Sequence, residues 1–269
     1  MKILSKKNSD GKLSIQEVPI PRLKKGFVLV KNVYSSLSLG TEKASIQIAK
    51  KNLIEKSRER PDDLKKVIEL MKKVGIRKAY EMAMSKLELP SPLGYSSAGI
   101  VIKTSPEIRS LKVGDRVACG GSGHAEIISV PENLCVKLNE DVRFEDAAFV
   151  TLSSIALQGI RQAGVSMGDY VAVIGMGLIG LITMKLLRAS GCVPVGVDID
   201  DKSIRLSNKL GFKSFNSKES SAILKLKECT KQGGFDNAII TASTKSKDPL
   251  DLATEILRDR GKITVVGDL

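Results

Sequence analysis

The sequence has 269 residues, of which 42% are hydrophobic and 27% charged, so it can bury a core and falls outside the disordered and fibrous classes. Its 43 Lys and Arg against 30 Asp and Glu give a net charge of +13 at pH 7. No apolar run approaches the length of a membrane-spanning helix, and the first seven residues are too polar for a signal peptide. With four cysteines and no CxxC pair, a disulfide framework is not expected, and we expect a cytoplasmic protein.

The positive charge is concentrated at the beginning of the chain, where residues 1–41 carry eight basic and two acidic side chains. A nucleic-acid interface would combine such residues with stacking aromatic side chains. Aromatic residues make up only 4% of this sequence, and Trp is absent. We therefore expect a Lys-rich solvated surface that attracts anionic small molecules, with neither a nucleic acid nor a membrane as partner.

The first 150 residues are predicted to be mainly β-structure with a helical insert at 42–89. Ser9-Asp10-Gly11 predicts a hairpin turn, and the insert contains a helix start at Pro61 and a second helix over about 76–87. The predicted strands cover residues 27–33, 97–102, 113–118, 124–130 and 134–136. This part is predicted to form a β domain of its own.

The remaining residues alternate between strands and helices, which is typical of a parallel, doubly wound sheet. A helix over 145–163, ended by Gly164, is predicted to lead into this part, and we place the domains at 1–150 and 151–269. The predicted strands are 170–174, 193–197, 212–215, 235–241 and 261–266, and the predicted helices are 178–190, 201–210, 218–231 and 249–258. The fold class is therefore α/β.

A glycine motif, Gly175-Met176-Gly177-Leu178-Ile179-Gly180, follows the first of these strands and begins an apolar helix. In this strand–turn–helix context G-x-G-x-x-G is the fingerprint of a dinucleotide site. Gly175 allows the tight turn, Gly177 lets the backbone approach a pyrophosphate, and Gly180 lets the helix pack on the strand. The free N–H groups of the helix start would then bind the phosphates. A Rossmann-like domain that binds no nucleotide is the alternative.

The identity of the nucleotide depends on Asp198, which ends the second strand 18 residues after Gly180. An acidic group there accepts hydrogen bonds from the ribose hydroxyls of NAD and repels the extra phosphate of NADP. Arg205 is the competing signal for NADP, and we favour NAD. Thr241 closes the fourth strand at the carboxyl edge of the sheet, where we expect its backbone to meet the cofactor.

Several motifs make the sequence resemble the medium-chain dehydrogenases/reductases of the alcohol dehydrogenase type. They are Leu39–Glu42, Leu93–Gly99, Val113–Val117, Gly123–Glu126 and the glycine motif, and the similarity that includes them extends over nearly the whole chain. The resemblance implies a GroES-like β-barrel domain followed by a Rossmann domain, with the active site in the cleft and Thr151 near the nicotinamide. Residues 34–42, 93–99 and 156–161 resemble more narrowly the zinc-less dehydrogenase half of bidomain oxidoreductases from bacterial polysaccharide gene clusters.

The sequence departs from this family at the zinc ligands and at its end. Zinc-binding members carry Cys where this chain has Leu39, and His-Glu where it has Tyr95-Ser96; the four-cysteine structural zinc lobe is also missing. Because Leu and Tyr cannot replace a thiolate or an imidazole as zinc ligands, we expect no metal site. The chain stops after the expected fifth strand, where the family continues with a sixth, so we expect a sheet truncated there with an exposed edge.

The catalytic residues are left open. Without zinc, the cofactor carries out the hydride transfer while the protein orients it and excludes water. Thr41, Tyr95 and His124 are weak candidates for proton delivery, with solvent as the alternative. Each also has a purely structural interpretation: a helix cap for Thr41, a packed ring for Tyr95 and a surface or turn histidine for His124. The four cysteines are interpreted as small buried apolar residues.

Together these features predict a zinc-independent oxidoreductase that transfers hydride between NAD(H) and a carbonyl/alcohol or activated double-bond substrate. The resemblance implies sugar or polysaccharide metabolism as the context. The alternative is a truncated nucleotide-binding module without catalysis that docks on a partner oxidoreductase. The expected partners are a small-molecule substrate and either copies of the same chain or a partner oxidoreductase domain.

Overall fold

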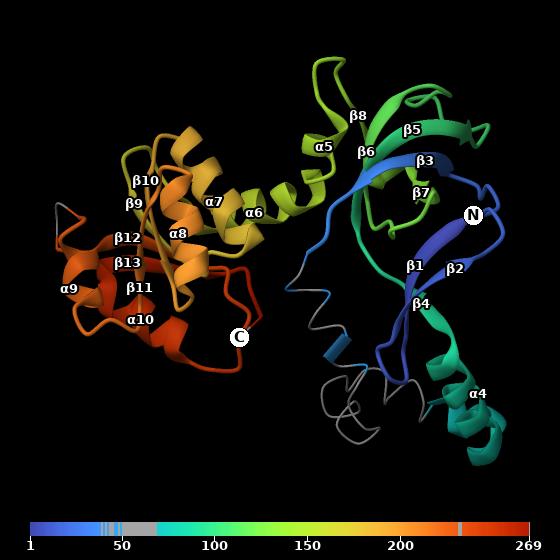
Figure 1. Ribbon diagram of the computed structural model, residues 1–269, viewed down its shortest axis with the longest axis horizontal. Coiled ribbons are helices and arrows are strands. Elements are labelled where there is room, and N and C mark those ends of the chain that lie inside the picture. The colour runs from blue at the N-terminus through green and yellow to red at the C-terminus, as the bar shows by residue number, and fades with distance from the viewer. Residues whose placement is uncertain are drawn as a thin grey trace. The chain divides into compact units, whose positions relative to one another are not determined.

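The computed structural model describes residues 1–38, 40, 42, 46, 47, 49, 69–230 and 233–268 (Figure 1). The chain divides into two compact units, Met1–Thr151 and Leu152–Leu269. Within the described residues, no helix is both long and apolar enough to cross a membrane. Thr41, Leu39 and the predicted helix start at Pro61 lie outside the described residues.

The first unit is built on a five-stranded antiparallel sheet of order β7-β3-β5-β6-β8. Its strands are β3 (Phe27–Ser35), β5 (Ser96–Thr104), β6 (Arg116–Gly120), β7 (Ile127–Pro131) and β8 (Cys135–Lys137), with the 3-10 turn η1 (Glu132–Leu134) before β8. Alternate residues such as Val28 and Val30 point into one apolar core, which also buries Val101, Val117 and Cys119. The predicted strands of this unit are therefore confirmed, although β6 and β7 each begin three residues later than predicted.

A second, three-stranded sheet of order β2-β1-β4 completes the β-structure of this unit. Strands β1 (Lys2–Lys7) and β2 (Leu13–Glu17) form the predicted antiparallel hairpin, and Gly11 has the positive φ, 74°, that its turn needs. The short β4 (Pro90–Pro92) pairs with β1 on its other side. Residues 69–74 and α4 (Ile76–Glu88) are helical, and Gly75 separates them.

The helix predicted over 145–163 is two helices in the structure, α5 (Phe144–Ala147) and α6 (Val150–Ala163). The first is only four residues long, and its buried Ala147 packs with Ala148, Ala98 and Ala118 in a small apolar cluster. The prediction of one continuous helix was therefore wrong. The predicted end of the helix is confirmed, because Gly164 follows α6 with a φ of 63°, a left-handed conformation that stops a helix.

The second unit contains a parallel sheet of order β11-β10-β9-β12-β13. Its strands are β9 (Tyr170–Ile174), β10 (Val193–Asp198), β11 (Lys213–Asn216), β12 (Phe235–Ile240) and β13 (Leu257–Val265). The helices are α7 (Leu178–Ala189), α8 (Asp201–Lys209), α9 (Ala222–Lys227) and α10 (Asp248–Ile256). Helix α9 is shorter and β13 longer than predicted, but the doubly wound arrangement is confirmed.

Both faces of this sheet are buried. Val171 and Val173 of β9 pack in one apolar cluster with Met184 and Leu187 of α7. The alternate residues Ala172 and Ile174 pack in a second cluster with side chains of α9 and α10. This alternation explains why the strand is a continuous apolar run in the sequence. The order of the strands reverses between β9 and β12, and at such a point the carboxyl edge of a doubly wound sheet binds its ligand.

Candidate functional site

The glycine motif forms a tight turn at this point of strand reversal. Gly175 has a φ of 107°, and a Cβ atom there would lie 2.6 Å from the backbone nitrogen of Ala242. A Cβ on Gly180 would collide with the carbonyl oxygen of Gly175 and lie 2.9 Å from Oγ1 of Thr241. The turn after β9 is therefore packed directly against the segment that follows β12.

Gly177 differs from the other two glycines because nothing surrounds it. Its φ is −72°, it is exposed, and a Cβ atom there would meet no heavy atom within 4 Å. It stands at the N-terminus of α7, and no described side chain caps this helix end. Free N–H groups and the positive end of the helix dipole suit this open position to a phosphate group.

The carboxylate of Asp198 lies beside this turn, at the end of β10. It accepts hydrogen bonds from the backbone N–H of Met176 at 2.5 Å and of Asp200 at 2.9 Å. A carboxylate has about four lone-pair positions, so two such bonds leave room for ribose hydroxyls. Arg205, the competing NADP signal, is exposed on α8.

The side chains of Met176, Leu178 and Ile179 in the motif, and that of Thr241 after β12, serve the packing of the turn. The side chain of Met176 is buried in the core beside the sheet, while Leu178 and Ile179 are half-buried on the first turn of α7. Their contribution to a nucleotide would come from the backbone. The hydroxyl of Thr241 donates to the carbonyl of Gly175 at 2.7 Å, so this residue holds the turn in place.

Thr151 lies in the first unit, at the start of α6. Its hydroxyl donates to the carbonyl of Cys119 on β6, at 3.4 Å. Both residues belong to the first unit, so this bond holds Thr151 against the five-stranded sheet. Proximity of Thr151 to the nicotinamide stays a prediction.

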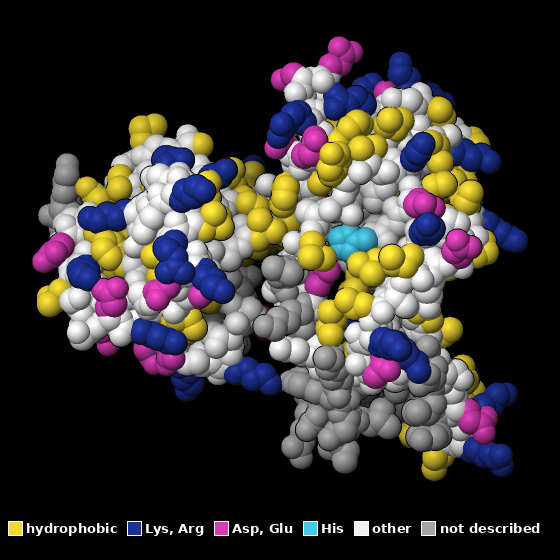
Figure 2. Space-filling view, viewed as in Figure 1, with side chains coloured by type: hydrophobic (Ala, Val, Ile, Leu, Met, Phe, Trp, Pro, Cys, Tyr) yellow, Lys and Arg dark blue, Asp and Glu magenta, His cyan; other side chains and the backbone are white. Residues whose placement is uncertain are grey.

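Of the two catalytic candidates among the described residues, His124 makes more side-chain polar contacts than Tyr95. Its Nδ1 lies 2.7 Å from Oγ of Ser35 on β3, and its Nε2 lies 3.2 Å from Oε1 of Glu42. The His124 and Glu42 side chains are only 13% and 8% exposed. Both ring nitrogens are thus engaged. His124 lies in the turn before β7, as one structural interpretation expected, but its side chain is mostly buried rather than on the surface. In Figure 2 the imidazole is visible among hydrophobic side chains.

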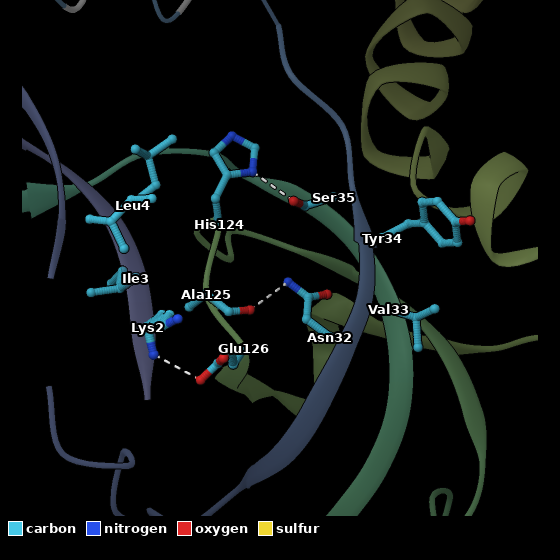
Figure 3. A pocket seen from close by; sticks show the side chains of 11 residues that line it. Lys2, Ile3, Leu4, Asn32, Val33, Tyr34, Ser35, His124, Ala125 and Glu126 are labelled. Atoms are coloured by element: carbon cyan, nitrogen blue, oxygen red, sulfur yellow. Dashed lines mark hydrogen bonds between the residues drawn. The ribbon is translucent and has the colours of Figure 1, made fainter. Parts of the chain in front are cut away.

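A cavity of about 460 Å³ lies beside His124 in the first unit. Figure 3 shows it between β1 and β3, with the segment from His124 to Glu126 at its base. Ser35 and Asn32 point into it, and Asn32 donates to the carbonyl of Ala125 at 3.1 Å. Tyr34 points away from the cavity, and the carboxylate of Glu145, which bonds to its phenol, raises the pKa of Tyr34.

Tyr95 is half-buried just before β5, and its backbone carbonyl accepts from Gly121. Gly94, the preceding residue, has a φ of 92°, and a Cβ atom there would lie 2.8 Å from the imidazole of His124. Ser35 and Glu42 were not predicted as partners of His124. Only the structure shows that Glu42 is buried, and no feature of the sequence distinguishes it from the other 29 acidic residues.

A metal ion does not fit the donor atoms that this cluster provides. Among the described residues no three His, Cys, Asp or Glu side chains lie together. The cluster around His124 consists of one imidazole, one carboxylate and the hydroxyl of Ser35, and both imidazole nitrogens are already engaged. A normal zinc site would need three or four thiolate, imidazole or carboxylate ligands.

Two family models match the chain. One, described as an alcohol dehydrogenase GroES-like domain, matches residues 63–140, and the other, described as a zinc-binding dehydrogenase, matches residues 179–268. They cover parts of the first and the second unit, respectively. The predicted resemblance to alcohol dehydrogenases is confirmed by these matches.

Relatives in sequence are dehydrogenases of alcohols and sugar alcohols. The chain is 36% identical to L-arabinitol 4-dehydrogenase of Talaromyces emersonii over 149 residues, 44% of this chain and 38% of that protein. It is 27% identical to an alcohol dehydrogenase of Geobacillus stearothermophilus over 214 residues, 68% of this chain and 62% of that protein. The chain therefore spans less than two thirds of the length of these curated relatives. Their names support an oxidoreductase role.

Solved structures show the same fold. The alcohol dehydrogenase TADH of Thermus sp. ATN1 matches 99% of this chain and 77% of its own, with a TM-score of 0.77 and 21% identity. The 2R,3R-butanediol dehydrogenase of Bacillus subtilis matches 100% of this chain and 78% of its own, with a TM-score of 0.73 and 20% identity. At these identities the likeness establishes the architecture of the two units.

Proposed function

Since the chain belongs to the medium-chain, zinc-type alcohol dehydrogenase-like family, we propose that it is an oxidoreductase that uses NAD(H) and works without zinc. Its substrate would be a small alcohol or the corresponding carbonyl compound, or an activated double bond. Relatives that act on sugar alcohols and butanediol favour a hydroxyl-rich substrate. The observation that carries the proposal is the open backbone at Gly177 beside the carboxylate of Asp198.

The residues that would hold the nucleotide all lie at the carboxyl edge of the parallel sheet. The N–H groups at the start of α7 would bind the pyrophosphate, and Gly177 leaves the space that it needs. Asp198 would accept hydrogen bonds from the ribose hydroxyls, and its negative charge would repel the additional phosphate of NADP. When bound, the nicotinamide supplies the hydride chemistry, and the protein supplies orientation and electrostatics.

For proton transfer we propose His124 rather than Tyr95 or Thr41. An imidazole changes its charge in the physiological range, unlike a phenol or a hydroxyl. Glu42 fixes one ring nitrogen, and Ser35 connects the other to the cavity of about 460 Å³. A proton could therefore pass between the imidazole and a substrate hydroxyl through the hydroxyl of Ser35.

The proposal that this protein works without zinc rests on the residues that stand at the positions of the family's zinc ligands. Tyr95 and Ser96 stand where zinc-binding relatives have His-Glu, and Leu39 stands where they have Cys. Elemental analysis of the purified protein tests this part. Less than about one tenth of a zinc ion per chain, and unchanged turnover after treatment with a chelator, are expected. Stoichiometric zinc whose removal abolishes turnover would overturn it.

The first experiment is a titration with NADH and with NADPH, following nucleotide fluorescence and melting temperature together. We expect NADH to bind more tightly and to raise the melting temperature in a concentration-dependent manner. If neither nucleotide binds, the NAD(H) proposal is wrong. A preference for NADPH would overturn the role of Asp198 and point to Arg205.

The second experiment is a screen of sugar alcohols, vicinal diols, ketoses, quinones and enones with the preferred nucleotide. Turnover that is lost in His124→Asn and retained in Tyr95→Phe supports the assignment of the proton-transfer group. The opposite result overturns it. Nucleotide binding without turnover of any substrate favours the second candidate, a binding module that docks on a partner oxidoreductase.

A further inference from the structure

Two cysteines that have no role in the proposed function face each other across the antiparallel sheet of the first unit. Cys119 on β6 and Cys135 on β8 are direct partners in the strand register, and their sulfur atoms lie 3.6 Å apart. Antiparallel partners have Cα atoms about 4.5 or 5.5 Å apart, and both values lie within the range that a disulfide spans. The backbone therefore needs no rearrangement to link them.

We propose that Cys119 and Cys135 form a reversible redox site, in which a hydroperoxide converts the two thiols into an intramolecular disulfide. The pair differs from the other two cysteines of the chain. Cys192 donates to the carbonyl of Ser166 and Cys229 to that of Lys225, so each has a backbone partner of its own. Proximity of a second thiol within the same sheet is the property that distinguishes the pair.

The two sulfur atoms differ in their surroundings, which assigns them different roles. Cys119 is 2% exposed and belongs to the core of the first unit, whereas Cys135 is half-buried at the start of the edge strand β8. Either thiol can donate in their shared hydrogen bond. When Cys135 is ionised it accepts from Cys119, which lowers the pKa of Cys135, while the same contact and burial raise the pKa of Cys119. Cys135 is thus the thiol that is more accessible and more readily ionised.

The reaction balances in two steps. The thiolate of Cys135 attacks one peroxide oxygen, so an S–O bond forms, the O–O bond breaks, and the leaving oxygen takes a proton as water or alcohol. The sulfur of Cys119 then attacks the sulfenic sulfur, the S–O bond breaks, and the hydroxyl leaves as water with the proton of the Cys119 thiol. Both sulfur atoms are oxidised by one electron each, and the peroxide is reduced by two.

The disulfide would change the edge of the five-stranded sheet. It would link β8, which has only three residues and the exposed side chain of Val136, covalently to its neighbour β6. Closing a loop of this length stabilises the folded state, so the melting temperature of the first unit should rise on the order of 5 °C on oxidation.

The experiment uses the full chain with Cys192→Ser and Cys229→Ser, so that only the pair remains. After treatment with stoichiometric hydrogen peroxide, we expect loss of both titratable thiols, a mass lower by two hydrogen atoms, and a peptide map that joins Cys119 to Cys135. Dithiothreitol should restore both thiols. Thiols that survive a tenfold excess of peroxide, or oxygen added to Cys135 without a crosslink, would overturn the proposal.

A matched control distinguishes the pair from general thiol oxidation. With Cys135→Ser added, Cys119 should lose its reactivity toward peroxide at least tenfold, because its thiol is buried and lacks the more exposed partner. Equal rates of oxidation of Cys119 with and without Cys135 would contradict the assigned roles. The unmodified chain is then treated in the same way, and a crosslink that involves Cys192 or Cys229 instead would overturn the proposal.

Discussion

The carboxylate of Asp198 accepts a hydrogen bond from the backbone N–H of Met176 over 2.5 Å, which joins the end of β10 directly to the glycine turn after β9. A negative charge is thereby held beside the open backbone of Gly177. Its position is fixed from two sides, since the N–H of Asp200 also donates to it at 2.9 Å. The charge that would select the nucleotide is thus part of the same hydrogen-bonded unit as the turn that would bind the phosphates.

Replacing Asp198 by Asn should weaken NADH binding about tenfold, because a hydrogen bond to a charged group contributes about 1.5–3 kcal/mol. Binding of NADPH should be unchanged or tighter, since the repulsion of its extra phosphate disappears. Fluorescence titration of both nucleotides measures the ratio. Asp201→Asn, on the exposed start of α8, is the control and should leave the ratio unchanged. An unchanged ratio in Asp198→Asn contradicts the role of this carboxylate.

Gly177→Ala and Gly175→Ala form a matched pair, because they add the same methyl group two residues apart. At Gly177 the φ of −72° suits any residue and the space is empty, so stability should change by less than about 0.5 kcal/mol while NADH affinity falls at least tenfold. At Gly175 the positive φ and the contact with Ala242 should lower the stability by about 2 kcal/mol or more.

Urea unfolding and NADH titration of both variants separate the two effects. If Gly177→Ala binds NADH like the unaltered chain, the pyrophosphate does not lie over this residue. A stable Gly175→Ala variant would show that the turn can relax, contrary to the packing around it.

The second unit could be predicted well from the sequence because its signals are local. Its buried strands are continuous apolar runs, and glycines stand wherever the turn requires them, as at Gly175 and Gly180. The arrangement of strands, with the reversal between β9 and β12, then follows from the general rule for such folds. The division of the predicted 145–163 helix at Ala148 carries no such signal, since it reflects packing against Ala98 and Ala118 in another part of the sequence.

The partners of His124 could not be predicted because they come from distant segments. Ser35 lies 89 residues from His124 in the sequence and Glu42 lies 82. Only the folded sheet brings them together, and no periodicity records such a contact. The same holds for Cys119 and Cys135, which were interpreted as separate apolar residues and are neighbours across two strands. A site whose side chains come from distant segments is thus not predictable from local sequence patterns. The glycine turn is predictable because its residues are consecutive.

Asp115 should make part of the stability dependent on pH. A hydrogen bond from Lys137, whose Nζ lies 2.7 Å away, and the backbone N–H of Lys112 hold the pKa of this carboxyl below its usual range. The folded state therefore favours the ionised form, so the stabilisation is present above the usual pKa of about 4 and is lost as the pH falls through the lowered value.

Asp115→Asn should accordingly reduce the free energy of unfolding by about 1 kcal/mol at neutral pH, a modest value because Lys137 is 55% exposed. At about pH 2 the variant and the unaltered chain should be nearly equally stable. Urea unfolding at both pH values measures the difference. Asp146→Asn, which removes an exposed pair with Arg143, is the control and should change the stability little at either pH. A difference that persists unchanged in acid contradicts this assignment.

The contact between His124 and Glu42 should be measurable as a coupling energy even before a substrate is known. His124→Phe retains a ring against Gly94 and removes the partner of a carboxylate that is 8% exposed, so it should cost about 2–4 kcal/mol. Glu42→Leu removes the buried charge, so the imidazole of His124 keeps only its bond to Ser35. The double variant contains neither the imidazole of His124 nor the carboxylate of Glu42, so neither group is left buried without the other. We expect it to be more stable than the sum of the two single changes implies, by at least about 1 kcal/mol. Urea unfolding of the four proteins gives this value directly. Additive losses would mean that the 3.2 Å contact contributes nothing, and His124 would then lack the fixed orientation on which its proposed role in proton transfer depends.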